Sequence, residues 1–250
     1  MFRATRIRAQ DSTATSDEVA LKLYNDPSED ERVEREIAMM HGVRHPSLAT
    51  LIEHGHIDLS NRRHRYVAWE FIDGIPLNVI LARGQLSPRE TAVLGCDIAR
   101  ALDYIWSNHK VVHRDVNPKN IMIRAGGAGA VLIDLGAARH LSLNTITAAG
   151  SSWGTDGYLS PEQARAETNL SCLSDVFCLG VTLLEAVGGS HPTARNQYQL
   201  VFNTPKAATV AATCPAALAA IIDSMLLPRA AFRPSPNVLV QRFTTLIPIL

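Results

Sequence analysis

The chain has 250 residues, 46% of them hydrophobic, which is long and apolar enough to bury a large core. Its 24 basic and 24 acidic residues cancel, so we expect no nucleic-acid partner, because a nucleic-acid-binding face needs excess positive charge. No apolar run reaches the roughly 18 residues that cross a bilayer, and the sequence therefore predicts no membrane segment in this chain. Its four cysteines lack the spacing of zinc sites or redox pairs, which favours free thiols in a reducing cytoplasm.

A strand and a helix are predicted near the N-terminus. Residues 18–24 alternate between polar and apolar types, are rich in strand formers and carry Lys22. Ser28 opens a helix, because Glu31 three residues later completes a capping box. We expect this helix to turn Glu36 toward the sheet and Lys22. The apolar residues that recur at helical spacing, and should pack inward, are Val33, Ile37 and Met40.

A further strand and two long helices are predicted later in the chain. Residues 65–72 read as a strand. Ser87 and Glu90 form a second capping box, with Pro88 at the first helical position. Residues 179–187 are almost continuously apolar, as expected for a helix buried at the centre of a domain.

The most informative stretch lies between these two helices. Residues 112–120 read Val-His-Arg-Asp-Val-Asn-Pro-Lys-Asn, and Asp134 follows an apolar strand further along. Asp115 can take a proton from a hydroxyl, while Asn120 and Asp134 can hold Mg²⁺ against a triphosphate, and this combination suits phosphoryl transfer. The glycines among residues 126–129 join two short apolar stretches, so we expect a hairpin turn there rather than a phosphate-binding loop.

These residues resemble the catalytic loop and metal-binding motif of the eukaryotic-type (Hanks-type) Ser/Thr protein kinases, in a form typical of bacteria. Further motifs follow in the family's order over nearly the whole chain. The strand that ends in Lys22 resembles the one that grips the α- and β-phosphates, and Glu36, ahead of His45-Pro46, resembles its helical partner. The remaining motifs are residues 154–163, similar to the end of an activation segment, residues 174–180, and Arg233-Pro234-Ser235.

The resemblance implies an α+β fold with the two lobes of a protein kinase. Residues 1–72 would form a partial, β-rich small lobe and hinge, truncated at its first strand, and residues 73–250 a larger, mainly helical lobe. No glycine precedes Gly42, so the glycine-rich loop that covers the phosphates in the family is not expected within this chain. A start site placed too late and a protein that lacks the loop both stay open as explanations.

The resemblance also implies ATP and Mg²⁺ as cofactors and a role for each site residue. Asp115 would orient the substrate hydroxyl and accept its proton, Lys22 would fix the phosphates, and Glu36 would hold Lys22. Asn117 stands where these kinases carry a Lys that contacts the γ-phosphate, so we expect an uncharged, weaker donor there. The residues expected to bind the nucleotide are Lys22, Ala20, Glu70, Ile72, Met122, Asn120 and Asp134, of which Asn120 and Asp134 would hold the metal.

Two structural contacts follow from the same resemblance. Asp175 would anchor the backbone of His113 and Arg114, and Glu162 would pair with Arg233. Regulation is expected from Arg114 together with Arg139, which would form a pocket for a phosphate on the loop after Asp134. The candidate acceptors on that loop are Thr147, our first choice, and Thr145, Ser151 and Ser152.

We therefore expect ATP-dependent phosphorylation of Ser or Thr in a protein substrate, weakened in this chain by Asn117 and the missing loop. Thr155, beside the catalytic Asp, favours Ser or Thr over Tyr acceptors, and Lys119 predicts that Arg-rich sequences are poor substrates. The alternative is a pseudokinase that acts as a nucleotide-binding or scaffold module. A small-molecule phosphotransferase of the same fold would not need residues 154–162. Self-association for autophosphorylation and a cytoplasmic location complete these expectations.

Overall fold

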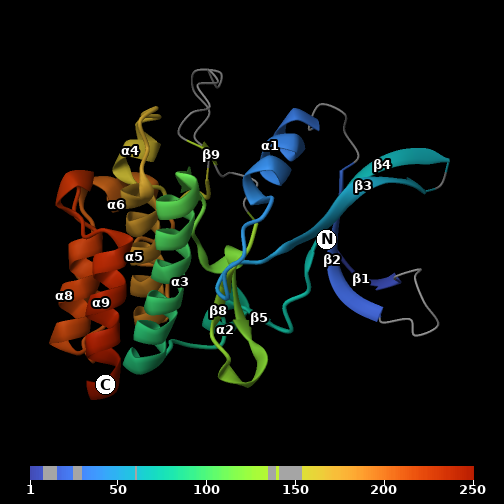
Figure 1. Ribbon diagram of the computed structural model, residues 1–250. Coiled ribbons are helices and arrows are strands. Elements are labelled where there is room, and N and C mark those ends of the chain that lie inside the picture. Colours follow the sequence, from blue (N-terminus) through green and yellow to red (C-terminus); the bar gives the residue numbers. More distant parts are fainter. Residues whose placement is uncertain (8–15, 25–29, 60, 135–138, 141–153) are drawn as a thin grey trace.

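The N-terminal part of the chain forms a four-stranded antiparallel sheet, and the C-terminal part is mainly helical (Figure 1). The computed structural model describes residues 1–7, 16–24, 30–59, 61–134, 139–140 and 154–250. This mixed α+β arrangement confirms the predicted fold class. The boundary expected between residues 72 and 73 stays a prediction. Within the described ranges, no helix has both the length and the apolar character that crossing a membrane requires.

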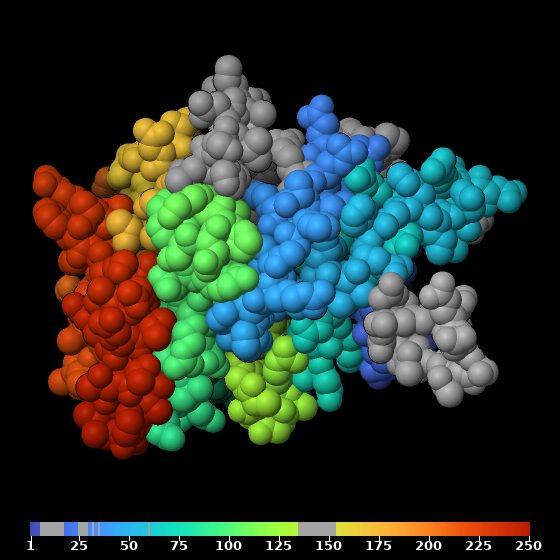
Figure 2. Space-filling model, in the orientation of Figure 1, coloured from blue at the N-terminus to red at the C-terminus, as the bar shows by residue number. Residues whose placement is uncertain are grey.

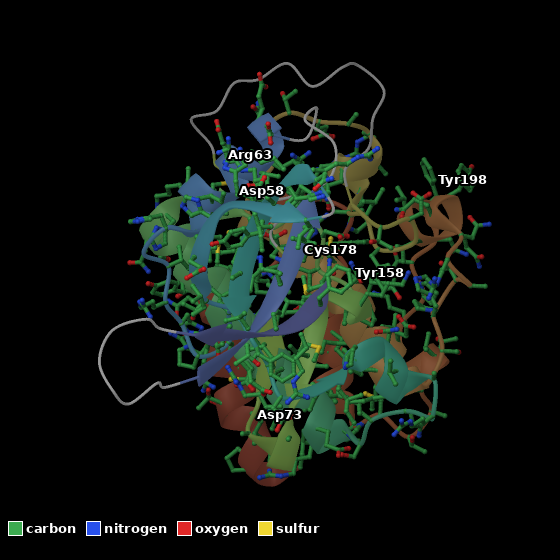
Figure 3. All side chains as sticks on the ribbon, turned by 90° about the vertical axis from the view of Figure 1, so that its right-hand side faces the viewer. Asp58, Arg63, Asp73, Tyr158, Cys178 and Tyr198 are labelled. Atoms are coloured by element: carbon green, nitrogen blue, oxygen red, sulfur yellow. The ribbon has the colours of Figure 1, made fainter. Side chains whose placement is uncertain are left out.

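Four strands make up the N-terminal sheet. They are β1 (Phe2–Ile7), β2 (Ser16–Tyr24), β3 (Leu51–Leu59) and β4 (Arg62–Glu70). Their order in the sheet is β1-β2-β4-β3, and all neighbours are antiparallel. Because alternate side chains of a strand share a face, Ala20, Lys22 and Tyr24 of β2 point to the same side. Asp58 and Arg63 are partners in the register of β3 and β4, near the end of their hairpin (Figure 3).

Helix α1 (Asp30–Met40) lies beside this sheet (Figure 1). Glu36 on α1 is only 1% exposed and lies against Tyr24 of β2, whose hydroxyl donates to Glu36 Oε2 at 3.3 Å. The expected capping residue Ser28 lies outside the described residues. The apolar side chains that the helical spacing predicts are all buried, and they are Val33, Ile37 and Met40.

Two long helices form the centre of the C-terminal part. Helix α3 (Pro88–His109) begins with the predicted capping box, in which Ser87 Oγ accepts from Glu90 N at 3.2 Å and Glu90 Oε2 accepts from Ser87 N at 2.8 Å. Helix α5 (Cys172–Gly188) is buried at every residue from 174 to 187, as its apolar run predicts. The other helices are α2 (Leu77–Leu81), α4 (Pro161–Ala164), α6 (Gln197–Phe202), α7 (Ala207–Val210), α8 (Ala216–Met225) and α9 (Pro236–Leu246).

Two smaller sheets lie where the N-terminal sheet meets the helices. Their strands are β5 (Gly74–Pro76), β7 (Ile121–Arg124) and β8 (Ala130–Leu132), which form one sheet, and β6 (Val111–Val112) and β9 (Arg139–His140), which form the other. In the turn between β7 and β8, Gly126, Gly127 and Gly129 have φ values of 70°, 74° and 102°, which glycine adopts without steric cost. This turn joins antiparallel strands and confirms the predicted hairpin.

Within the described residues, two main-chain connections join the sheet to the helical part. One is the chain itself, at residues 71–73. The other is a pair of backbone hydrogen bonds, from Leu132 N to Ser47 O at 2.9 Å and from Ala49 N to Leu132 O at 3.1 Å. Beside it, the rings of His45 and Tyr104 have centroids 5.2 Å apart. Figure 2 shows the blue surface of the segment after α1 against the green surface of α3.

A buried ion pair joins two distant segments of the helical part. Arg233 Nη1 and Nη2 lie 2.6 and 3.0 Å from Glu162 Oε1 and Oε2, which confirms the predicted pairing. Burial by itself raises the pKa of Glu162, but the bonds from Arg233 outweigh burial and bring that pKa below its ordinary value. The other N–H groups of Arg233 donate to the carbonyl oxygens of Leu173, Leu227 and Pro228.

We predict that Arg233→Met lowers the free energy of unfolding by about 3–5 kcal/mol, because it leaves the buried Glu162 carboxylate without its charge partner. Urea denaturation followed by circular dichroism measures this change. The matched control is Arg165→Met, which removes an exposed pair, Arg165 Nε to Glu167 Oε1 at 2.7 Å. That change should cost about 1 kcal/mol or less. Equal losses in both variants would contradict the prediction.

Candidate active site

The catalytic loop is fixed to α5 by one buried carboxylate. Asp175, in the first turn of α5, is 1% exposed and accepts from His113 N at 2.8 Å and from Arg114 N at 2.7 Å. This confirms the anchoring predicted for Asp175. Burial raises the pKa of Asp175 to about 7, although the two backbone donors act in the opposite direction. Arg114 has a φ of 71°, so the anchor holds a backbone conformation that a non-glycine residue seldom adopts.

His113 is fully buried beneath this loop. Its Nδ1 accepts a hydrogen bond from Asp115 N at 3.3 Å. Burial lowers the pKa of His113 more than the nearby carboxylates of Asp115 and Asp134 raise it, so the ring is neutral at pH 7. A neutral ring can keep Nδ1 as an acceptor, and this shapes the loop around Asp115.

Four donors hold the carboxylate of Asp115. Its Oδ1 accepts from Thr155 N and Thr155 Oγ1, both at 2.8 Å, and from Asn117 Nδ2 at 2.9 Å. Its Oδ2 accepts from Asn120 Nδ2 at 2.8 Å. Thr155 thus lies beside Asp115, where the resemblance places it. The orientation of this carboxylate is therefore fixed from several directions.

Asn117 points toward Asp115 rather than outward. The side chain is 1% exposed, and its Nδ2 also donates to Asp115 O and Thr155 Oγ1, both at 3.1 Å. Its Oδ1 accepts from Lys119 N at 2.9 Å and caps the short 3₁₀ turn Pro118–Asn120. All polar atoms of this amide are thus engaged within the loop, whereas the sequence suggests a donor that reaches a phosphate.

Lys22 lies near two carboxylates, those of Glu36 on α1 and of Asp134 after β8, and near the Tyr24 ring. Its Nζ is 3.3 Å from Asp134 Oδ1 and 5.3 Å from the centre of the Tyr24 ring. Burial lowers the pKa of Lys22, but Glu36 first and then Asp134 outweigh burial and raise that pKa above its ordinary value. Lys22 Nζ donates to Asp134 Oδ1, while Glu36 acts on Lys22 through its charge and accepts from Tyr24.

The two residues expected to hold a metal are neighbours across strands β7 and β8. Ile133 N, next to Asp134, donates to Asn120 O at 2.8 Å. Asn120 Nδ2 is committed to Asp115, which leaves the amide oxygen as the atom available to a cation. Among the described residues, no three His, Cys, Asp or Glu side chains gather as a metal site. One carboxylate and one amide oxygen suit Mg²⁺, which takes few protein ligands and completes its shell with phosphate and water.

A cavity of about 770 Å³, open to solvent, lies between the sheet and β7. Five of the seven residues expected to bind nucleotide line it, namely Ala20, Glu70, Ile72, Met122 and Asp134. Trp69 and Ile133 add apolar walls. Glu70 Oε1 accepts from Arg124 Nη2 at 2.9 Å, which ties the end of β4 to β7 at the edge of the cavity. The remaining two residues contact the lining of this cavity: Lys22 Nζ contacts Asp134, and Asn120 O accepts from Ile133 N.

The regulatory prediction falls largely outside the described residues. The backbone of Arg139 pairs with Val112, but its side chain is not described. The expected phosphate acceptors, Thr145, Thr147, Ser151 and Ser152, lie in residues 141–153, which are also not described.

Sequence reasoning missed two residues that shape the site. Tyr24 donates to Glu36, and its ring lies 5.3 Å from Lys22 Nζ. Tyr24 comes two residues after Lys22 on a strand, so both side chains lie on one face, and this spacing was a usable signal. Gln163 Nε2 donates to Arg114 O at 2.8 Å. Ser160 and Gln163 also form a capping box, which the Ser-x-x-Gln pattern indicates.

Comparison with known proteins agrees with this geometry. The sequence matches the protein kinase domain family over residues 6–243. It is 36% identical over 173 residues to the serine/threonine-protein kinase PknB of Mycolicibacterium smegmatis and 34% identical to PknB of Mycobacterium tuberculosis, matches that cover 68% of this chain and 27% of each relative. A probable serine/threonine-protein kinase of Streptomyces coelicolor is 33% identical over 199 residues, which are 75% of this chain and 29% of that protein. The chain thus spans less than a third of the length of these relatives.

We predict that His113 makes stability fall as the solution is acidified. The pKa of His113 is lower in the folded protein than in the unfolded chain, so the stability it provides is present above about pH 6.5. It is lost below that pH, by up to about 1.4 kcal/mol per pH unit, because the unfolded chain then binds a proton that the folded one does not. Urea unfolding of wild type and His113→Phe between pH 5 and 8 measures the slope.

The difference between the two proteins should shrink as the pH falls, because the variant lacks the group that resists protonation. His54→Phe, at an exposed strand position, controls for the loss of one imidazole. A difference that stays constant from pH 8 to pH 5 would show that His113 is not the buried neutral group described above.

Proposed function

Because this chain belongs to the protein kinase domain family, we propose that it transfers the γ-phosphate of ATP to Ser or Thr hydroxyls of a protein substrate. The observation that carries this proposal is the carboxylate of Asp115, which four hydrogen bonds from Thr155, Asn117 and Asn120 hold in one orientation. Phosphoryl transfer has a loose transition state, so positioning and charge neutralisation supply most of the catalysis. A fixed acceptor, together with a cavity that five of the expected nucleotide-binding residues line, supports that chemistry.

Asp115 would orient the substrate hydroxyl and accept its proton. Oδ2 accepts a single hydrogen bond, from Asn120 Nδ2, so one of its two lone pairs is available to the substrate hydroxyl while the other donors hold Oδ1. Asn117, whose amide donates to Asp115 and Thr155, acts in this proposal as a positioning residue. Asn117 is uncharged, so position 117 lacks the positive charge that a Lys provides there in the family.

ATP and Mg²⁺ are general cofactors of the family, and the residues of this chain fit them. Bound Mg²⁺ would neutralise charge on the phosphates. Asn120 and Asp134 offer the hard oxygen atoms for it, and Lys22, with its raised pKa, stays charged to hold the phosphates. Glu36 and Tyr24 keep Lys22 in place. Ala20, Met122 and Ile72 would contact the adenine in the cavity, with the backbone at Glu70 and Ile72 as its polar partner.

The rival function, a nucleotide-binding scaffold without transfer, receives less support. A scaffold needs Lys22 and the cavity but has no use for the four donors on Asp115. We place the protein domain in the cytoplasm, where ATP is available and where its four free cysteines, three of them buried, stay reduced. Self-association for autophosphorylation belongs to the same proposal.

We predict that Asp115→Asn and Asp134→Asn separate transfer from binding. Asp115→Asn should lower kcat by about 10²–10⁴ because the acceptor is lost, and should leave the affinity for Mg-ATP unchanged. Asp134→Asn should weaken nucleotide binding only when Mg²⁺ is present. Transfer from labelled ATP and calorimetry with and without Mg²⁺ measure both. The control is Asp58→Asn, at an exposed position near the end of the β3–β4 hairpin.

Two results would count against the proposal. Transfer that survives Asp115→Asn would remove Asp115 from the reaction. Tight Mg-ATP binding by wild type, with no transfer to any protein or peptide, would favour the scaffold.

We further predict that Asn117→Ala lowers kcat by about tenfold to a hundredfold, because Asp115 loses one of its donors and small displacements of a catalytic group are costly. The KM for ATP should stay the same, since Asn117 does not line the nucleotide cavity. Steady-state kinetics separates the two parameters, and Asn203→Ala, at an exposed helix end, is the control. A rise in KM for ATP with unchanged kcat would show that Asn117 contacts the nucleotide instead.

A further inference from the structure

A second hollow, of about 600 Å³, opens beside the Asp115 carboxylate. Asn117 and Thr155 line it, and both donate to Asp115 Oδ1, so a peptide segment lying in the hollow would contact two of the residues that hold the proposed acceptor of the hydroxyl proton. Its other walls come from α2 and from the ends of elements far apart in the sequence. They include Asn78, Leu81, Lys119, Tyr158, Glu185 and Arg195.

The charges that this hollow presents are positive. The charged residues in its wall are Lys119, Arg195 and Glu185. Lys119 and Arg195 are exposed, and among the described residues no carboxylate lies within 4 Å of either. Glu185 is only 9% exposed and accepts a hydrogen bond from Tyr158 Oη at 2.5 Å. Its carboxylate is thus engaged inside the protein, whereas the two cations are available to a ligand.

Arg195 is held in place by an unusual backbone turn. Ala194 and Arg195 have φ values of 46° and 65°, a left-handed conformation that costs a non-glycine residue about 1 kcal/mol or more. His191 stabilises the turn, because its Nδ1 accepts from Arg195 N at 2.9 Å and its Nε2 lies 2.8 Å from Gly157 O. Gly157 allows the approach, since a Cβ there would come within 2.9 Å of Arg195 Cα. The turn is therefore fixed against the segment that carries Thr155 and Tyr158.

We propose that this hollow selects substrates in which acidic side chains flank the acceptor Ser or Thr, with Lys119 and Arg195 as the residues that recognise them. This inference rests on the proposed kinase function and adds the substrate class. Lys119 lies four residues after Asp115, and Arg195 lines the same hollow. Carboxylates on a bound peptide would meet both cations, whereas arginine side chains would meet only repulsion and an occupied Glu185.

The test uses three peptides that differ only in the residues flanking one Ser, with Glu, Gln or Arg at those positions. A fourth peptide carries phosphoserine in place of Glu and separates carboxylate from phosphate recognition. Phosphate transfer gives kcat and KM for each peptide. Fluorescence anisotropy with Ser→Ala versions of the same peptides gives binding without transfer. The proteins are wild type, Lys119→Glu, Arg195→Glu and the control Lys206→Glu, which makes the same charge change at an exposed residue outside the hollow.

In wild type the Glu peptide should bind about five times more tightly than the Gln peptide, as expected for one unit-charge contact near a surface in water, and the preference should weaken at high salt. The difference should appear in KM and not in kcat. Lys119→Glu and Arg195→Glu should each abolish or reverse the preference, while Lys206→Glu should keep it.

Failure of this inference is distinguishable from failure of the proposed function. Transfer to all three peptides with equal KM, or a preference for the Glu peptide that persists in both Lys119→Glu and Arg195→Glu, would overturn acidic recognition and leave the kinase function standing. Binding of the Glu peptide that depends on Lys119 and Arg195, with no transfer to any peptide, would support the recognition and overturn the kinase function. A preference confined to the phosphoserine peptide would overturn the assignment to carboxylates.

Discussion

The catalytic loop depends on the carboxylate of Asp175, which binds the backbone N–H groups of two consecutive residues, His113 and Arg114. The N–H of His113 is buried and that of Arg114 is partly buried, so losing this acceptor would be costly and the loop keeps one low-energy path over α5. The path of the backbone at His113 and Arg114 sets the position of the residues that follow. Asp115 is the next residue, and its own N–H is taken by the ring of His113. A helix that is buried along most of its length thereby fixes the position of a half-exposed carboxylate.

The polar groups of the site fall into two classes with different tasks. Asp175, His113 and Asn117 are almost fully buried and satisfy the loop from within. Asp115, Lys22 and Asp134 keep part of their surface exposed and can meet a ligand. The buried class holds the exposed class in place, because unpaired polar groups in the interior would be costly. Substitutions in the exposed class should therefore act on kinetics directly, whereas substitutions in the buried class should act on stability and, through the groups they hold in place, on kinetics.

The sequence was sufficient for features that depend on local pattern or on a family motif. The capping box of α3, the buried face of α1, the glycine hairpin and the pairs made by Asp175 and Glu162 were all predictable, since each depends on spacing or on motif residues. The inward orientation of Asn117 was not, because it depends on Thr155, 38 residues away. The position of Arg195 was not predictable for the same reason. Its position depends on a contact of His191 with Gly157, and the two left-handed residues of the turn, Ala194 and Arg195, are neither Gly nor Asn.

The two connections between the sheet and the helical part have a mechanical consequence. The chain at residues 71–73 and the backbone bonds that join Leu132 to Ser47 and Ala49 are two separate main-chain attachment points. Two fixed points on a rigid body define a line, and rotation about that line is the displacement that strains neither attachment. Rotation of the sheet about that line would change the width of the cavity mouth and would stretch the ion pairs Glu70–Arg124 and Lys22–Asp134, so these pairs resist it. Because the second attachment consists of main-chain atoms, side-chain substitutions at residues 47–49 alter the stiffness of this motion more readily than its axis.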